Sequence, residues 1–115
     1  MVDINQLPEQ WAKLETKLKE QFGKKLNLEA ILFLIGMREL GSGPKEFSKE
    51  EKVDLMHIAT CRVLSGSGYY ELDFVDQEGW PHWKELRALP PMDMLSQELF
   101  LKSHIVDYFS DIYEL

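Results

Sequence analysis

The sequence predicts a mainly α-helical protein: a compact array of about four helices, with a small β-hairpin or extended arm between the third and the fourth. Apolar residues recur at helical spacing in four segments, and the spacing changes to every second residue only near residues 69 to 75. At 115 residues the chain suits one domain and is short for two ordinary ones. We therefore expect a single helical domain over residues 1 to 115.

The first helix is expected from Pro8 to Phe22. Proline suits a first helical position because its missing N–H would be unpaired there. Gly23 follows the last apolar residue, as is typical of a helix C-terminus. The residues of the expected apolar face are Trp11, Leu14, Leu18 and Phe22.

The second helix is expected over Leu28–Leu40, with Asn27 as its N-cap. Apolar residues occupy nearly every side of this segment. A helix of that kind is usually packed on several sides, so we expect it at the centre of the array. Gly41 ends it, and the composition of residues 41 to 44 predicts a turn.

The third helix is expected from Lys49 to about Leu64. Ser48 and Glu51 have the spacing of a capping box, in which each side chain bonds the backbone amide of the other residue. The glycines and serines of residues 65 to 68 end the helix. The residues of its expected apolar side are Val53, Met56, Ala59, Val63 and Leu64.

A hairpin is expected next, because apolar and acidic residues alternate over residues 69 to 75, as in a strand with one buried face. Residues 76 to 79 read as a turn, and Trp80 to Leu86 as the returning strand. Pro81 is tolerable there only on an edge or at the strand's start, and a short helix opening at Pro81 stays an alternative. After two prolines, the last helix runs from about Asp93 to Tyr113.

The net charge of −7 lies almost entirely in the C-terminal part of the chain. Residues 1 to 65 carry ten basic and ten acidic groups, whereas residues 66 to 115 carry three basic groups against ten acids. Nucleic-acid binding depends on lysines and arginines that neutralise phosphates. We therefore expect no nucleic-acid partner.

The chain has one cysteine, so an intramolecular disulfide and a multi-cysteine zinc site are excluded. Its N-terminal residues lack the positive and apolar regions of a secretory signal. The longest apolar run, residues 30 to 35, is far shorter than the roughly 20 residues of a membrane span. These features predict a cytoplasmic protein that uses no membrane and no cofactor.

An aromatic segment inside the hairpin is the strongest candidate for an interaction surface. Tryptophans bury a large area at low entropic cost, which suits a protein–protein contact. The alternative is that the indoles cover the helical core. The residues of the candidate surface are Tyr69, Tyr70, Trp80, Pro81, His82 and Trp83.

A second candidate site lies on the third helix. His57 and Cys61 are four residues apart, and Asp54 precedes them at similar spacing, so the three side chains share one border of the helix. A metal would find nitrogen, sulfur and oxygen donors there, and a thiol nucleophile would find a base. No recognised metal spacing is present, and Cys61 lies mid-helix, where no dipole lowers its pKa.

Three segments resemble a family of small uncharacterised bacterial proteins of the Bacteroidetes type. They are LNLEAILFLIGMRELG, SKEEKVDLMHIATCRVLS and GYYELDFVDQEGWPHW, which together cover the chain from about Leu26 to Trp83. The resemblance implies no activity and no functional residue. From the residues themselves, the first hypothesis is a non-enzymatic interaction or scaffolding protein that binds itself as a homodimer or another protein. The alternative is a small metal-dependent or thiol enzyme centred on His57 and Cys61.

Overall fold

The computed structural model describes residues 5–41, 45–113 and 115, and it confirms a mainly α-helical chain with a hairpin between the third and fourth helices. Contacts divide the chain into two compact units: residues 1–26 with 90–115, and residues 27–89. The array of helices around Leu28–Leu40 and the single domain stay predictions. The predicted turn lies outside the described residues at positions 42 to 44. The elements in chain order are α1 (Leu7–Phe22), α2 (Leu28–Leu40), α3 (Lys49–Ser65), β1 (Tyr70–Val75), β2 (Pro81–Glu85) and α4 (Met94–Tyr113).

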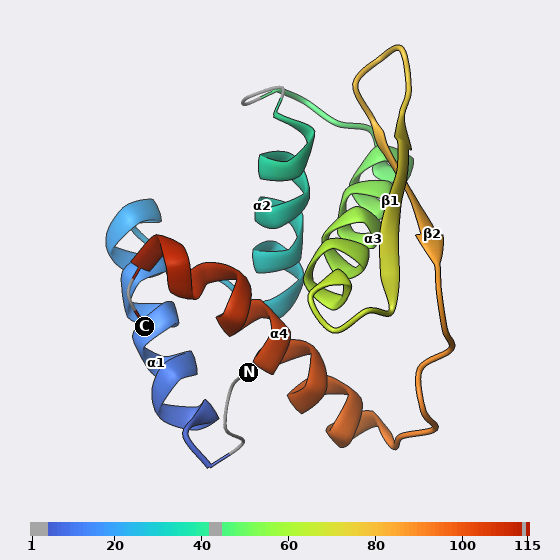
Figure 1. Ribbon diagram of the computed structural model, residues 1–115. Coiled ribbons are helices and arrows are strands. Elements are labelled where there is room, and N and C mark those ends of the chain that lie inside the picture. The colour runs from blue at the N-terminus through green and yellow to red at the C-terminus, as the bar shows by residue number, and fades with distance from the viewer. Residues whose placement is uncertain (1–4, 42–44, 114) are drawn as a thin grey trace. The chain divides into compact units, whose positions relative to one another are not determined.

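The first unit pairs α1 with α4, which lie side by side in Figure 1. The Nζ atom of Lys102 on α4 lies 5.0 Å from the centre of the Trp11 ring on α1, and the Tyr113 hydroxyl donates a hydrogen bond to Gln21. These contacts join both ends of the pair. The buried apolar residues of the two helices are Leu7, Leu14, Leu18, Ile105, Val106 and Phe109.

The apolar face of the last helix is only partly buried. Leu95 is 67% exposed, and Phe22 of α1, which was predicted on the apolar face of its helix, is also exposed. Burial on α4 begins at His104, whose Nδ1 lies 2.7 Å from the Phe100 carbonyl oxygen. The first turns of α4 therefore extend beyond the buried part of the helix.

The second unit is built on the close packing of α2 against α3. Both helix starts form as predicted: Asn27 Oδ1 accepts the Ala30 amide at 2.8 Å, and Ser48 and Glu51 make the capping box with bonds of 2.9 and 3.1 Å. At Gly36 a Cβ atom would lie only 2.2 Å from the Leu55 carbonyl oxygen. The two backbones thus approach as closely as a glycine permits.

The buried side of α3 differs from the prediction. Val53 is 58% exposed, whereas Leu55 and Ile58 are buried. Val53 lies two residues before Leu55, about 200° around the helix, so both cannot face α2. Ala59, Val63 and Leu64 are buried as expected.

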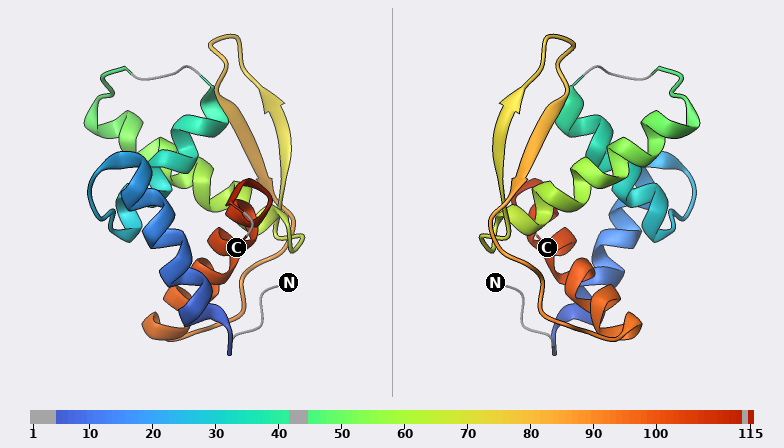
Figure 2. Two further views of the ribbon diagram at one scale, coloured as in Figure 1. Left: turned by 90° about the vertical axis from the view of Figure 1, so that its left-hand side faces the viewer. Right: turned by 90° about the vertical axis from the view of Figure 1, so that its right-hand side faces the viewer.

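The hairpin is confirmed, and the alternative of a short helix opening at Pro81 is wrong. β1 and β2 pair antiparallel in a two-stranded sheet, and the ribbon runs back along α3 until its turn reaches the helix's N-terminal end (Figures 1 and 2). The Leu86 amide donates to the Tyr69 carbonyl oxygen, so these two residues form a hydrogen-bonded pair. Hydrogen-bonded and non-hydrogen-bonded pairs alternate in an antiparallel ladder, so the backbone groups of Glu85 and Trp83 point outward from it. The Val75–Pro81 pair is likewise a non-hydrogen-bonded pair, whose backbone groups point outward. Pro81 therefore opens its strand where no ladder donor is needed.

No helix in the described part of the chain is both long and apolar enough to cross a membrane.

Candidate functional site

A β-bulge at Asp73 decides which residues the hairpin exposes. Leu72 pairs with Trp83 and Phe74 with His82, so Asp73 is left without a partner in the register. Because His82 and Trp83 are neighbours on β2, their side chains and those of their partners point to opposite faces. The prediction that one face of β1 is buried is wrong beyond Tyr70: Leu72, Phe74 and Val75 are 50%, 52% and 55% exposed.

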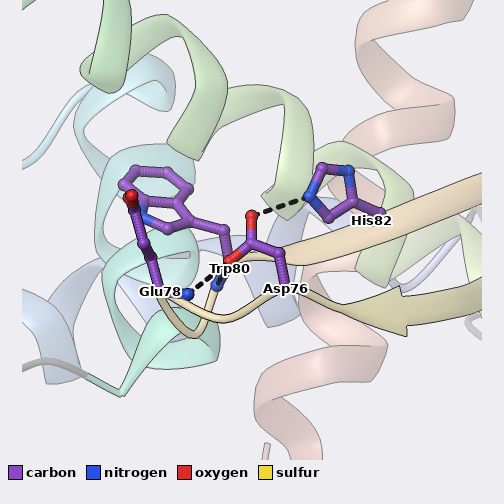
Figure 3. A network of polar contacts seen from close by, with 4 residues as sticks. All are labelled: Asp76, Glu78, Trp80 and His82. Carbon is purple, nitrogen blue, oxygen red and sulfur yellow. Dashed lines mark hydrogen bonds and ion pairs between the residues drawn. The ribbon is translucent and has the colours of Figure 1, made fainter.

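The turn is organised by one carboxylate. Asp76 Oδ1 accepts the amides of Glu78 and Trp80, each at 2.9 Å, and Oδ2 lies 2.9 Å from His82 Nε2. Figure 3 shows the carboxylate between the turn amides and the imidazole. The hydrogen bond to His82, followed by those from the turn amides, holds the pKa of Asp76 below its usual range. Phe74 completes this arrangement by stacking on the His82 ring, with centres 4.4 Å apart.

A pocket of about 490 Å³ lies between α3 and the hairpin. That volume is within the range of small-ligand sites. Among the described residues, no lysine or arginine contributes to its wall. The lining residues are Glu51, Asp54, His57 and Ile58 from α3, and Asp76, Glu78, Trp80, Pro81, His82 and Trp83 from the turn and β2.

Edge-on aromatic contacts fix one wall of this pocket. The centres of the Trp80 and Phe47 rings lie 6.5 Å apart, and those of Phe47 and Phe33 of α2 lie 5.9 Å apart. Trp80 therefore packs on the aromatic pair formed by α2 and the segment before α3, and it also lines the pocket. Trp83 is also half-buried, and its Nε1–H has no acceptor among the described residues.

The two tyrosines of the predicted interaction surface lie at the base of the hairpin, away from the pocket lining. Tyr69 is buried beneath Arg87, whose guanidinium carbon lies 4.0 Å from the ring centre. Arg87 also donates to the Ser67 carbonyl oxygen at 2.8 Å. Burial raises the pKa of Tyr70. Both rings thus tie the strand to the end of α3.

The His57, Cys61 and Asp54 group is only partly assembled. His57 Nε2 lies 3.6 Å from Cys61 Sγ, and His57 and Asp54 reach the pocket, but Cys61 is fully buried and does not line it. Burial raises the pKa of the Cys61 thiol to about 11, and a protonated thiol is a poor nucleophile and metal ligand. Across the described residues, no three histidine, cysteine or acidic side chains converge as a metal site requires.

The structure thus brings His57 together with the tryptophan segment, although each was considered separately from the sequence. The pocket's carboxylates at positions 51, 76 and 78 were not identified as site residues. The signal for Asp76 and Glu78 was the run of acids around the turn, which is equally typical of a solvated surface, and Glu51 was identified only as part of the capping box. No family model, no curated protein and no solved structure matches the chain.

Proposed function

We propose that this protein is a non-enzymatic interaction module, and that its hairpin binds an apolar, positively charged segment of another protein. The observation that carries the proposal is the half exposure of Leu72, Phe74 and Val75, which leaves apolar side chains uncovered on both faces of a two-stranded sheet. Surface apolar residues are common singly, but three of them on one short hairpin indicate a contact surface.

Charge complementarity favours a basic partner. Residues 69 to 86 carry five acids and a single lysine. A negative surface of this kind attracts positively charged segments and repels acidic ones, which sets partner choice and association rate.

The same charges disfavour pairing between two copies. Glu71 and Asp73 flank Leu72 on β1, so two antiparallel β1 strands centred on Leu72 would place each glutamate opposite an aspartate. Like charges directly across a strand pair are destabilising. We therefore propose a different protein as the partner, in preference to a homodimer.

Selection from a phage-displayed library of random linear peptides, with the full chain as target, tests this proposal. We expect the selected peptides to be rich in lysine or arginine and in apolar residues. Phe74→Ser should weaken their binding about fivefold, because the exposed half of this ring is worth roughly 1 kcal/mol when covered. Leu95→Ser is the matched control, since Leu95 is also a large apolar residue, is 67% exposed and belongs to the other unit.

Acidic or charge-neutral peptides as the main selected class would contradict the proposal, as would equal binding to the Phe74→Ser variant. Sedimentation equilibrium of the free chain is the second measurement. A dimer that Phe74→Ser dissociates would replace the basic partner with a second copy.

A further inference from the structure

We infer that the pocket between α3 and the hairpin receives a cationic side chain, a lysine ammonium or an arginine guanidinium, from the bound protein segment. This inference rests on the proposed function, because it takes the cation to belong to that partner. It assigns a ligand chemistry to the pocket.

The first step is charge. In the part of the chain that the structure describes, four carboxylates line the pocket, at Glu51, Asp54, Asp76 and Glu78, and no lysine or arginine does. Glu51 is engaged in the capping box and Asp76 in the turn. The side chains of Asp54 and Glu78 make no hydrogen bond or ion pair within the described part of the chain, so they are available to a ligand.

The second step is the aromatic wall. The indoles of Trp80 and Trp83 line the same cavity as these carboxylates. An organic cation over an indole face is attracted by the ring's quadrupole, and tryptophan is the best of the aromatic residues for this. The pocket therefore combines the two groups that recognise lysine and arginine side chains.

The third step concerns the size and class of the cation. The carboxylates are spread around the wall and, among the described residues, do not converge as a metal site requires. An extended organic cation can contact separated carboxylates and an indole together, which a bare metal ion cannot.

The fourth step is continuity with the proposed contact surface. Phe74 stacks on His82, and His82 lines the pocket. A partner segment that covers Phe74 therefore lies next to His82, which lines the cavity.

Nuclear magnetic resonance of the three indole N–H groups tests the inference with defined probes. The full chain is titrated with N-acetyl-arginine amide, N-acetyl-lysine amide and, as the neutral counterpart of arginine, N-acetyl-citrulline amide. We expect saturable shifts at Trp80 and Trp83 with the two cations and none with citrulline. Trp11 is an internal control, since it lies in the other unit beneath Lys102.

Asp54→Asn combined with Glu78→Gln should weaken binding of the cationic probes at least about threefold, because two exposed ion pairs are lost. Asp107→Asn combined with Asp111→Asn removes the same charge from α4 and should change nothing. Both of these control residues are exposed.

Citrulline shifts equal to those of arginine, or unchanged binding by the Asp54/Glu78 variant, would overturn the inference. The outcome is separable from that of the proposed function. If selected peptides depend on Phe74 but bind the Asp54/Glu78 variant as tightly as the wild type, the inference about the pocket is wrong and the proposed function stands. If the cationic probes bind at the indoles but no peptide is selected, the proposed protein partner is wrong.

Discussion

Gly36 is the residue at which the fold tolerates least change. A methyl group at this position would meet the Leu55 carbonyl oxygen, carbon and Cβ within 3 Å, and two of these are backbone atoms that cannot rotate away. The close approach of α2 and α3 thus depends on the missing side chain.

We expect Gly36→Ala to destabilise the protein by about 3 kcal/mol or more, the upper range for overpacking. The better helix propensity of alanine offsets only about 1 kcal/mol. The free energy of unfolding from denaturant titration measures the change. Gly66→Ala is the matched control: Gly66 has right-handed helical backbone angles, and a Cβ there lies 3.7 Å from its nearest neighbour. A neutral Gly36→Ala would disprove the close packing of the helices.

Asp76 gives the hairpin a defined response to acid. Its folded-state pKa is lowered from the ordinary 3.8, chiefly by His82 and then by the turn amides. The carboxylate therefore contributes stability above pH 3.8 that is lost as the pH falls through the lowered pKa.

We expect the nuclear magnetic resonance shifts of Trp80 and His82 in the wild type to change as the pH falls through the pKa of Asp76. This change should be absent in Asp76→Asn. Hydrogen bonds also lower the pKa values of Glu51 and Asp93, so acid sensitivity of the whole chain does not isolate the turn. Asp73→Asn, at the bulge, is the control. An unchanged transition in Asp76→Asn would assign it to other carboxyls.

At the scale of elements, the hairpin depends on its anchors. A two-stranded sheet alone is marginal in water. Here Tyr69 is buried at one end, and at the other Trp80 meets the Phe47 ring edge-on. The hairpin is thus held at its base and its turn, while the strand surface between these points stays exposed.

Phe47→Leu should weaken the anchor at the turn. We expect a loss of about 1–2 kcal/mol in unfolding free energy, from imperfect refilling of a buried site and the lost ring contacts. Faster hydrogen exchange should appear at the amides of residues 76 to 80. Phe22→Leu, at an exposed ring in α1, should change stability by less than about 0.5 kcal/mol. Equal protection of the turn in both variants would contradict the anchoring role of Phe47.

Some features of the helices and strands could be predicted from the sequence, and others could not. The capping box at Ser48 and the N-cap at Asn27 are local chemistry, and both were predictable. The start of β2 at Pro81 was less so, because the sequence placed the strand from Trp80 and left a helix opening at Pro81 as an alternative. The bulge at Asp73 was not, because an alternating pattern does not reveal which residue lacks a partner. Nor was the pocket, since its walls come from residues 51–58 and 76–83, and only the docking of the hairpin on α3 brings these together.

At the scale of the whole molecule, the net charge of −7 sets how partners approach. The acids of the hairpin, with Asp76 and Glu78 of the pocket among them, belong to the C-terminal excess of negative charge visible in the sequence, whereas Glu51 and Asp54 come from the charge-balanced part before residue 66. A basic segment is attracted to this surface over a distance that salt controls, since the Debye length falls from about 10 Å at 0.1 M to about 3 Å at 1 M.

We therefore expect binding of a selected basic peptide to weaken steadily as salt rises, mostly through a slower association rate. Surface plasmon resonance over a salt series measures both rates. The Asp54/Glu78 variant should show a shallower salt dependence than the wild type. Affinity that is independent of salt would assign recognition to apolar contacts alone.

A map of amide and indole chemical shifts, recorded for one selected peptide bound to the full chain, decides whether the hairpin is the binding element. We expect the shifts to concentrate on residues 71 to 83, including the indoles of Trp80 and Trp83. Shifts concentrated on α1 and α4 would contradict this expectation.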